Sequence, residues 1–218
     1  MKKILYSAMY GGDAFPFTEL AENVISAKDP SQLKEKDSLL VLWGGADINP
    51  DIYRHPKSRT THNYPYRDDI EVALANKAIE LGIPIIGVCR GAQLLCALAG
   101  GFLIQDVTNH AGSHHTVDTY DGARFRVNSI HHQMLAGLEN VEHDMLAWST
   151  EKRSSHYTYK DDQVYVPSNT FVEPEAVWFP TIKGLAIQWH PEAMDENSEA
   201  TKFVLREYHE RTNQQATV

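Results

Sequence analysis

The feature that most constrains the fold is the run Gly-Val-Cys-Arg-Gly-Ala-Gln at positions 87–93. Apolar residues typical of a strand precede it at 83–86, and apolar helix formers follow it at 92–99. Glycines two positions before and two positions after Cys89 permit the sharp strand-to-helix turn of a nucleophile elbow. We therefore expect Cys89 to project from the edge of a sheet, where the N-terminus of the next helix favours its thiolate form.

Length and composition predict one globular domain covering residues 1–218. Of these residues, 42% are hydrophobic and 22% are charged, as in ordinary soluble proteins. The formal net charge is −9 and Lys and Arg do not cluster, which argues against a nucleic-acid partner. No apolar stretch approaches the roughly 20 residues of a membrane span, and the N-terminal apolar run has no signal-peptide cleavage site. Cys89 and Cys96 are too far apart on one helix for a disulfide, so we expect a cytoplasmic protein with reduced thiols.

The order of elements predicts an α/β fold. Strands are expected at 3–9, ending at Gly11-Gly12, at 38–43 and at 83–86, and helices at 17–27, 67–81 and 92–99. Strands that alternate with helices form a parallel sheet covered on both faces. Later strands are expected at 102–104, 125–127, 145–148, 175–179 and 184–189, followed by a helix at 199–210. The polar stretch 149–170 is expected to form hairpins or a surface insertion. We predict a flavodoxin-like, three-layer fold: a mostly parallel central sheet with helices on both faces and a small antiparallel extension.

A histidine and a glutamate complete a possible catalytic triad with Cys89. His190 follows the strand at 184–189, and Pro191 and Glu192 come next. Side chains two positions apart in an extended segment lie on the same side, so Glu192 can orient the His190 ring. The other ring nitrogen can then take the thiol proton, as in Ser–His–Asp sites. We expect Cys89 and His190 to meet at one edge of the sheet.

At this point three motifs resemble the signatures of class I glutamine amidotransferase domains. They are Gly44-Gly45-Ala46-Asp47, the elbow at 87–93, and Gln-Trp-His-Pro-Glu at 188–192. Within that superfamily the chain most resembles the γ-glutamyl hydrolase branch, the C26 peptidases. Arg67-Asp68 with Glu71 is similar to the Arg-Asp-x-x-Glu pattern of that branch, and Asn-Ser-Ile-His-His-Gln at 128–133 is similar to its Asn-Ser-x-His-His-Gln motif. Trp43 and Tyr64 depart from the family, which usually has proline and aspartate there.

The resemblance implies a Cys89–His190–Glu192 triad that hydrolyses the amide bond of glutamine or of a γ-glutamyl compound through a glutamyl thioester. It implies that backbone N–H groups of Arg90 and of the Gly44-Gly45 turn, at Gly45, hold the oxyanion. The residues implied to hold the glutamyl end of the substrate are Gln93, Ser129, His131 and His132. Arg67, Asp68 and Glu71 are either a charged first helical turn or an ion pair near the active site.

The eleven histidines do not predict a metal site. The adjacent pairs His114-His115 and His131-His132 would face opposite ways in a strand, so neither pair is a natural chelate. We expect His110, His114 and His115 in a surface loop. We therefore predict no bound metal and no cofactor.

Two other functions stay open beside a free-standing hydrolase of γ-glutamyl compounds. The chain is either a glutaminase subunit that passes ammonia to a separate synthetase or ligase, or a non-catalytic binding module with the same fold. Release of glutamate from γ-glutamyl amines by the chain alone favours the hydrolase. Inertness on glutamine until a synthetase is added favours the subunit, and a Cys89→Ala variant equal to wild type favours the module.

Overall fold

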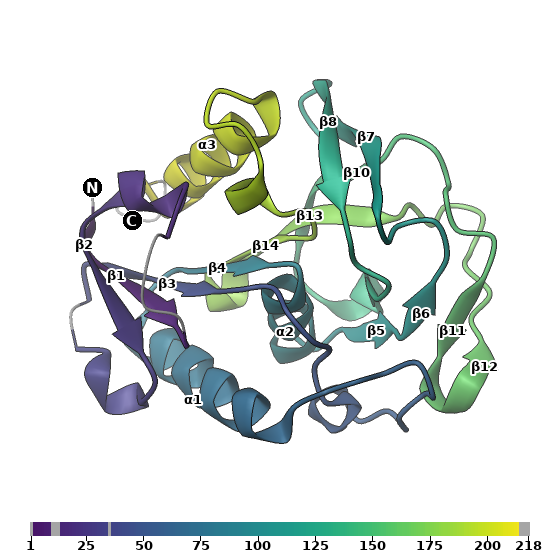
Figure 1. Cartoon of the computed structure of the whole chain (residues 1–218), viewed down its shortest axis with the longest axis horizontal. Helices are drawn as coiled ribbons and strands as arrows, with labels where there is room; N and C mark the ends of the chain where they lie inside the picture. The colour runs from purple at the N-terminus through teal and green to yellow at the C-terminus, as the bar shows by residue number, and fades with distance from the viewer. Residues whose placement is uncertain (1, 10–13, 35, 214–218) are drawn as a thin grey trace.

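A mixed β-sheet forms the centre of the molecule. The computed structural model describes residues 2–9, 14–34 and 36–213. Within these residues a nine-stranded sheet has the order β2-β1-β3-β4-β14-β13-β10-β7-β8 (Figure 1). Its strands are β1 (Lys2–Ala8), β2 (Ala21–Ala27), β3 (Ser38–Leu42), β4 (Ile85–Val88), β7 (Ser113–Thr119), β8 (Arg124–Ser129), β10 (Asp144–Ser149), β13 (Pro174–Phe179) and β14 (Gly184–Ile187).

The two halves of this sheet differ in strand direction. Strands β2, β1, β3, β4 and β14 are parallel neighbours. Strands β13, β10, β7 and β8 continue the sheet with antiparallel pairings. The α/β prediction holds, but the expected small antiparallel extension is wrong in size, because antiparallel strands make up nearly half of the sheet. The tight turn Pro180–Ile182 joins β13 to β14, and a turn this short can only join antiparallel neighbours.

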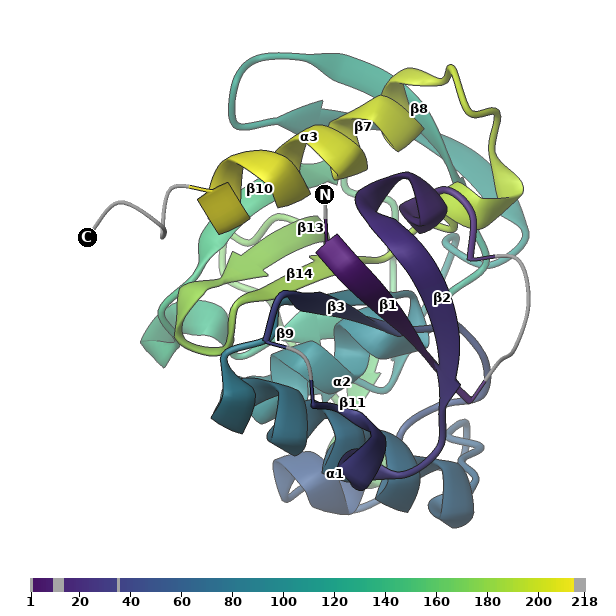
Figure 2. The ribbon, with the colours of Figure 1, turned by 90° about the vertical axis from the view of Figure 1, so that its left-hand side faces the viewer.

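Helices cover both faces of the sheet, as predicted. Helices α1 (Pro65–Leu81) and α2 (Arg90–Leu98) lie on one face, and α3 (Glu199–Asn213) lies on the other (Figures 1 and 2). Alternate residues of β3 supply the two cores: Leu40 and Leu42 pack toward α1 and α2, while Leu39 and Val41 pack toward α3. A strand covered on both faces needs such a continuous apolar run. None of the described helices is both long enough and apolar enough to cross a bilayer.

The helix predicted at 17–27 is wrong. Phe17–Leu20 forms one 3₁₀ turn, and the rest of the segment is β2, which pairs in parallel with β1 at the sheet edge. Val24 and Ile25 follow one another in this strand, and β-branched residues favour extended backbone over helix. The helical spacing of Leu20 and Val24 was therefore misleading. The predicted end of the first strand, at Gly11-Gly12, lies outside the described residues.

Two small sheets flank the antiparallel half. One pairs β5 (Phe102–Ile104) with β9 (Met134–Ala136), and the other has the order β12 (Gln163–Val164), β11 (Tyr157–Tyr159), β6 (Asp106–Val107). The segment 149–170 thus contains the β11–β12 hairpin. Tyr157 of this hairpin is buried against Ile104 and Val107, which fixes the hairpin on the rest of the fold.

Candidate active site

The nucleophile elbow is present between β4 and α2. Cys89 joins the two elements with φ 50° and ψ −104°, a backbone conformation that non-glycine residues rarely adopt. The flanking glycines permit the close approach of three chain segments. A Cβ at Gly87 would lie 2.4 Å from the Gly91 carbonyl oxygen, and one at Gly91 would lie 2.2 Å from the Leu42 oxygen. Any side chain at either position would push the elbow apart.

His190 and Glu192 reach the same edge of the sheet as Cys89. Strand β14 is the parallel neighbour of β4, with Ile187 opposite Val88, so both strands end at one level. Beyond β14, His190 Nδ1 lies 2.7 Å from Glu192 Oε1. A Cβ at Gly44 would lie 2.6 Å from His190 Cε1 and 3.5 Å from Cys89 Cβ. The imidazole, the cysteine and the Gly44 backbone therefore meet at one point, although they are far apart in the sequence.

The groups around His190 favour its protonated, imidazolium form. Burial alone would lower the pKa of His190, but Cys89 and then Glu192 outweigh burial and raise that pKa to about 10. His190 Nε2 is buried and has no hydrogen-bond partner of ordinary geometry among the described residues. The Cys89 sulfur is a close neighbour of this ring and the first of the groups that raise its pKa. A cysteine beside an imidazole is the pairing that activated thiol nucleophiles use.

The Gly44-Gly45 turn is held by Arg67. The Arg67 guanidinium donates from Nη2 to the carbonyl oxygens of Trp43, at 2.9 Å, and of Gly44, at 3.0 Å. Because a trans peptide directs its C=O and N–H to opposite sides, the N–H of Gly45 points away from Arg67. Gly45 has φ +144°, and a Cβ there would lie 2.2 Å from Arg67 Nη1. Both its backbone conformation and this contact require glycine.

A buried ion-pair network connects this turn to the elbow. Arg67 Nε lies 2.8 Å from Glu71 Oε1, while the Arg90 guanidinium pairs with both Glu71 and Asp68. The side chains of Arg90 and Glu71 are 1% and 0% exposed, so this is not a solvated helical turn. The ion-pair interpretation of Arg67, Asp68 and Glu71 is therefore the correct one. The network fixes the residue after Cys89 against α1.

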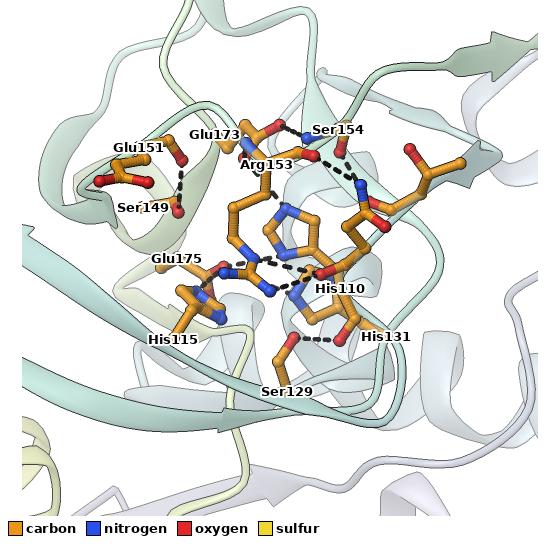
Figure 3. A network of polar contacts seen from close by, with 12 residues as sticks. His110, His115, Ser129, His131, Ser149, Glu151, Arg153, Ser154, Glu173 and Glu175 are labelled. Atoms are coloured by element: carbon orange, nitrogen blue, oxygen red, sulfur yellow. Dashed lines mark hydrogen bonds and ion pairs between the residues drawn. The ribbon is translucent and has the colours of Figure 1, made fainter.

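The residues expected to hold the substrate occupy two different environments. His132 lies beside the Gly44–Asp47 motif, with Nε2 3.0 Å from Asp47 Oδ1 and Nδ1 3.1 Å from Asp106 Oδ1. Gln93 donates from Nε2 to the Gln133 carbonyl oxygen at 3.3 Å. Ser129 and His131 instead point into the antiparallel half, where the Ser129 hydroxyl donates to the carbonyl oxygen of His110 (Figure 3).

Sequence reasoning missed one residue that holds His190 in place. The Asn128 side chain accepts a hydrogen bond from the His190 N–H at 2.8 Å and donates to the His190 carbonyl oxygen at 2.9 Å. This two-point contact links the end of β8 to the segment after β14. The signal was available, because Asn128 is the first residue of the Asn-Ser-x-His-His-Gln motif.

The expected surface loop of histidines is wrong: two of the three are buried, and the exposed one, His114, lies on strand β7. His110 is 0% exposed and His115 is 5% exposed, whereas His114 is exposed. His114 and His115 do face opposite ways, since both lie on β7. The inward side of β7 is therefore the one that carries His115, and polar composition alone could not show that this side is covered.

Comparison with known proteins adds family information to this geometry. The model of the peptidase C26 family matches residues 24–134, just over half of the chain. "Putative glutamine amidotransferase-like protein YvdE" of Lactococcus lactis is 29% identical over 192 residues, which cover 76% of this chain and 70% of that protein. A Mycobacterium tuberculosis protein described as a "Putative glutamine amidotransferase" is 31% identical over 178 residues, covering 72% of this chain and 51% of that protein.

Two further proteins are similar at lower sequence identity. The carbamoyl phosphate synthase small chain of Xanthomonas campestris is 25% identical over 133 residues, covering 57% of this chain and 29% of that protein. The crystal structure of a glutamine amidotransferase from Thermotoga maritima superposes with a TM-score of 0.58 at 15% identity, covering 100% of this chain and 87% of that one. This last likeness shows a common fold. The family model and the sequence relatives establish that the chain belongs to the glutamine amidotransferase-like peptidase C26 family.

Proposed function

We propose that the protein is a cysteine-dependent hydrolase of γ-glutamyl amide bonds, with Cys89, His190 and Glu192 as its triad. The observation that carries this proposal is the meeting of the elbow cysteine and the His190–Glu192 pair against Gly44. A nucleophile, a base and an orienting carboxylate in this order are the parts that covalent amide hydrolysis needs.

The reaction follows from the roles of these groups. The Cys89 thiolate attacks the δ-carbonyl carbon of the γ-glutamyl group, and the carbonyl electron pair moves onto oxygen. The His190 imidazolium then gives its proton to the leaving amine as the C–N bond breaks, which leaves a glutamyl thioester. Neutral His190 next takes a proton from water, whose oxygen attacks the thioester and releases the glutamate product. Glu192 stabilises the imidazolium that forms in each half of the reaction.

The proposed oxyanion donors are two backbone N–H groups. Arg90 is the first residue of α2, where a backbone N–H has no partner within the helix and the helix dipole is positive. The N–H of Gly45 points away from Arg67, and the adjacent Gly44 packs against Cys89 and His190. Loss of one such donor typically costs about 10²–10³ in rate. We retain Gln93 and His132 as candidates for binding the glutamyl end, because Ser129 and His131 are engaged in the antiparallel half.

The test is the activity of the purified chain without any partner. We expect glutamate release from a panel of γ-glutamyl amines and from glutamine, and a single adduct on Cys89 after exposure to an electrophilic glutamine analogue, detected by mass spectrometry. The adduct should disappear in His190→Ala and persist in Cys96→Ala. Labelling of Cys96 alone, or glutamate release that survives loss of Cys89, would contradict the proposal.

A second function is favoured by one of the relatives. The name of the carbamoyl phosphate synthase small chain denotes one subunit of a larger enzyme, so a role as a glutaminase subunit is a specific alternative. In that case the chain is labelled at Cys89 yet releases little glutamate alone, and added cell extract raises glutamine hydrolysis with ammonia passed to a product. Turnover of γ-glutamyl amines by the chain alone rejects this alternative.

A further inference from the structure

A second cluster of histidines and glutamates lies inside the antiparallel half of the sheet (Figure 3). His115 is on β7, His110 precedes that strand, His131 follows β8 and Glu175 is on β13. Each of these four side chains is 0% or 1% exposed. The mechanism above uses none of them. Ionisable groups this deeply buried need an explanation in terms of what neutralises them.

Three imidazole nitrogens converge on one carboxylate oxygen. Glu175 Oε1 lies 2.8 Å from His115 Nε2, 3.4 Å from His110 Nδ1 and 3.5 Å from His131 Nε2. None of these four atoms has a hydrogen-bond partner of ordinary geometry within the described part of the chain. Close approach without hydrogen-bond alignment distinguishes this cluster from an ordinary buried network, in which buried polar atoms are paired.

Glu173, which binds His110 from outside the cluster, determines which ring nitrogen faces Glu175. His110 Nε2 lies 3.0 Å from Glu173 Oε2. The Glu173 carboxylate also accepts from the N–H groups of Arg153 and Ser154 and from the Tyr157 hydroxyl, at 2.8–2.9 Å. A carboxylate that already accepts these three hydrogen bonds is an acceptor for His110 as well, so His110 Nε2 carries a proton. Nδ1 is then the ring nitrogen left to bind a metal ion, which displaces any proton held there.

His131 is arranged in the same way. Its Nδ1 lies 2.9 Å from the carbonyl oxygen of Gln133, which can only accept, so Nδ1 carries the proton. The Nε2 lone pair then faces the lone pairs of Glu175 at 3.5 Å. A cation between these atoms turns that repulsion into four favourable contacts.

We propose that His110 Nδ1, His115 Nε2, His131 Nε2 and Glu175 Oε1 are the ligands of a divalent transition-metal ion, Zn²⁺ in the first instance. Zn–N and Zn–O distances of about 2.0–2.1 Å in a tetrahedron place ligand atoms about 3.3 Å apart. Glu175 Oε1 lies 2.8–3.5 Å from the three ring nitrogens, and the ligand atoms of His110, His115 and Glu175 all lie within 4.8 Å of one another, so these three form the core of the site and His131 completes it from the far side of Glu175. Three imidazoles and one carboxylate suit Zn²⁺ rather than Mg²⁺ or Ca²⁺. Glu173 and the Gln133 carbonyl fix the ring tautomers, the usual task of groups behind metal-ligating histidines.

Four protein ligands make this a structural site. It joins the β7–β8 hairpin to β13, which lies much further along the chain. Near the end of β8, Asn128 holds the His190 backbone at two points. The ion therefore braces the part of the molecule that positions the catalytic histidine. The competing explanation is a second proton on His110, bridging Glu173 and Glu175.

The experiment measures metal content and thermal stability of the full chain refolded in the presence of Zn²⁺. Refolding is chosen because the hollow of about 450 Å³ that reaches His115 is also lined by Arg124, Arg126 and Arg153, which repel an incoming cation. We expect one Zn²⁺ per chain by mass spectrometry of the elements. The melting temperature should rise by roughly 5–10 °C at a hundredfold excess of Zn²⁺ over its Kd. Co²⁺ in its place should give the visible absorption bands of a tetrahedral site.

Matched variants test the ligand set. His115→Gln should lose the bound metal and the shift in melting temperature, while His114→Gln, its exposed neighbour on the same strand, should keep both. Glu175→Gln should weaken binding at least tenfold, and it covers the case in which His115→Gln does not fold. Wild-type protein that holds less than about a tenth of an equivalent of Zn²⁺, Co²⁺ or Ni²⁺, with an unchanged melting temperature, overturns the proposal in favour of the proton. Metal binding that survives in both His115→Gln and Glu175→Gln overturns it too.

Discussion

The molecule contains two His–Glu pairs with nearly the same contact geometry but different surroundings: the partly exposed His190–Glu192 pair (the open pair) and the buried His110–Glu173 pair (the closed pair). In the parallel half, His190 Nδ1 lies 2.7 Å from Glu192 Oε1. In the antiparallel half, His110 Nε2 lies 3.0 Å from Glu173 Oε2. The first pair is partly open, with side chains 12% and 29% exposed, whereas the second is 0% and 1% exposed. The free nitrogen of His190 faces a cysteine, and that of His110 faces another carboxylate.

This contrast shows that a His–Glu pair does not by itself define a catalytic site. The carboxylate does the same work in both places, since it fixes which ring nitrogen carries the proton. The group opposite the second nitrogen decides the outcome. In the proposed function the cysteine on a strained elbow makes His190 a proton carrier, whereas in the proposed metal site a buried carboxylate makes His110 part of a cation-binding cluster. The predictions that follow test this division, beginning with the largest expected effect.

The largest effect is expected at the cysteine that faces His190. Cys89→Ala removes the nucleophile and should lower kcat for glutamate release by about 10⁴-fold or more. Cys96 is the matched control: it lies in the core of α2, and burial raises its pKa to about 12. Cys96→Ala should keep kcat and lower the free energy of unfolding by about 1 kcal/mol. Equal activity of wild type and Cys89→Ala would support the non-catalytic binding module instead.

The next effect is at the orienting carboxylate of the open pair. Glu192→Gln preserves shape but cannot stabilise an imidazolium, so kcat should fall by about 10²–10⁴-fold. The free energy of unfolding at neutral pH should change by less than about 1 kcal/mol, because this side chain is partly exposed. Glu196→Gln, an exposed carboxylate four residues further on, is the control and should change neither quantity. A variant that keeps full kcat would remove Glu192 from the triad.

The same variant predicts a change in the pH dependence of stability. His190 has its pKa raised to about 10 in the folded protein, against about 6.5 when unfolded. Its contribution to stability is therefore fully present below about pH 6.5 and is lost as the pH rises toward 10. In Glu192→Gln one cause of the raised pKa is gone, so the loss should be smaller and should end at a lower pH. Urea unfolding at a series of pH values measures it, and identical profiles would contradict the assignment.

The parts of the fold and site that the sequence could predict lie mainly in the parallel half of the sheet. The elbow, the edge where Cys89 and His190 meet, and helix α1 were predictable, because glycine spacing, apolar runs and the Gly82 that ends α1 are local signals. Apolar runs also predicted strands β8, β10 and β13 one by one, but not the edge strand β2, the strand β7 or the order in which the antiparallel strands pair. These strands pair with partners far along the chain, and the inward side of β7 is defined only once β13 and the loop at His110 cover it. Burial of His110 and His115 depends on tertiary contacts, so the inference from polar sequence to a surface loop was wrong.

For the buried His110–Glu173 pair we expect a large loss in the free energy of unfolding, whereas Glu192→Gln should mainly lower kcat. Glu173→Gln leaves His110 and several N–H and O–H donors facing a neutral amide in the interior. Breaking a buried charged network of this kind costs about 3 kcal/mol or more in the free energy of unfolding. Urea unfolding of this variant beside Glu192→Gln gives the comparison directly. A smaller loss in Glu173→Gln than in Glu192→Gln would reverse the roles assigned to the two pairs.

The smallest effect is expected at a third histidine that connects the two halves. His132 contacts Asp47, in the loop after β3, and Asp106, on β6, and its side chain is about one-third exposed. The two carboxylates, Asp47 first, outweigh burial and raise the pKa of His132. This contribution to stability is present below about pH 6.5 and is lost as the pH rises past the raised value.

His132→Gln should therefore lower the free energy of unfolding by up to about 1 kcal/mol at pH 5.5, reduced by solvent screening, and by less at pH 9. His114→Gln, an exposed histidine, should show no such difference. Equal losses at both pH values would mean that His132 joins the halves by packing and not by charge.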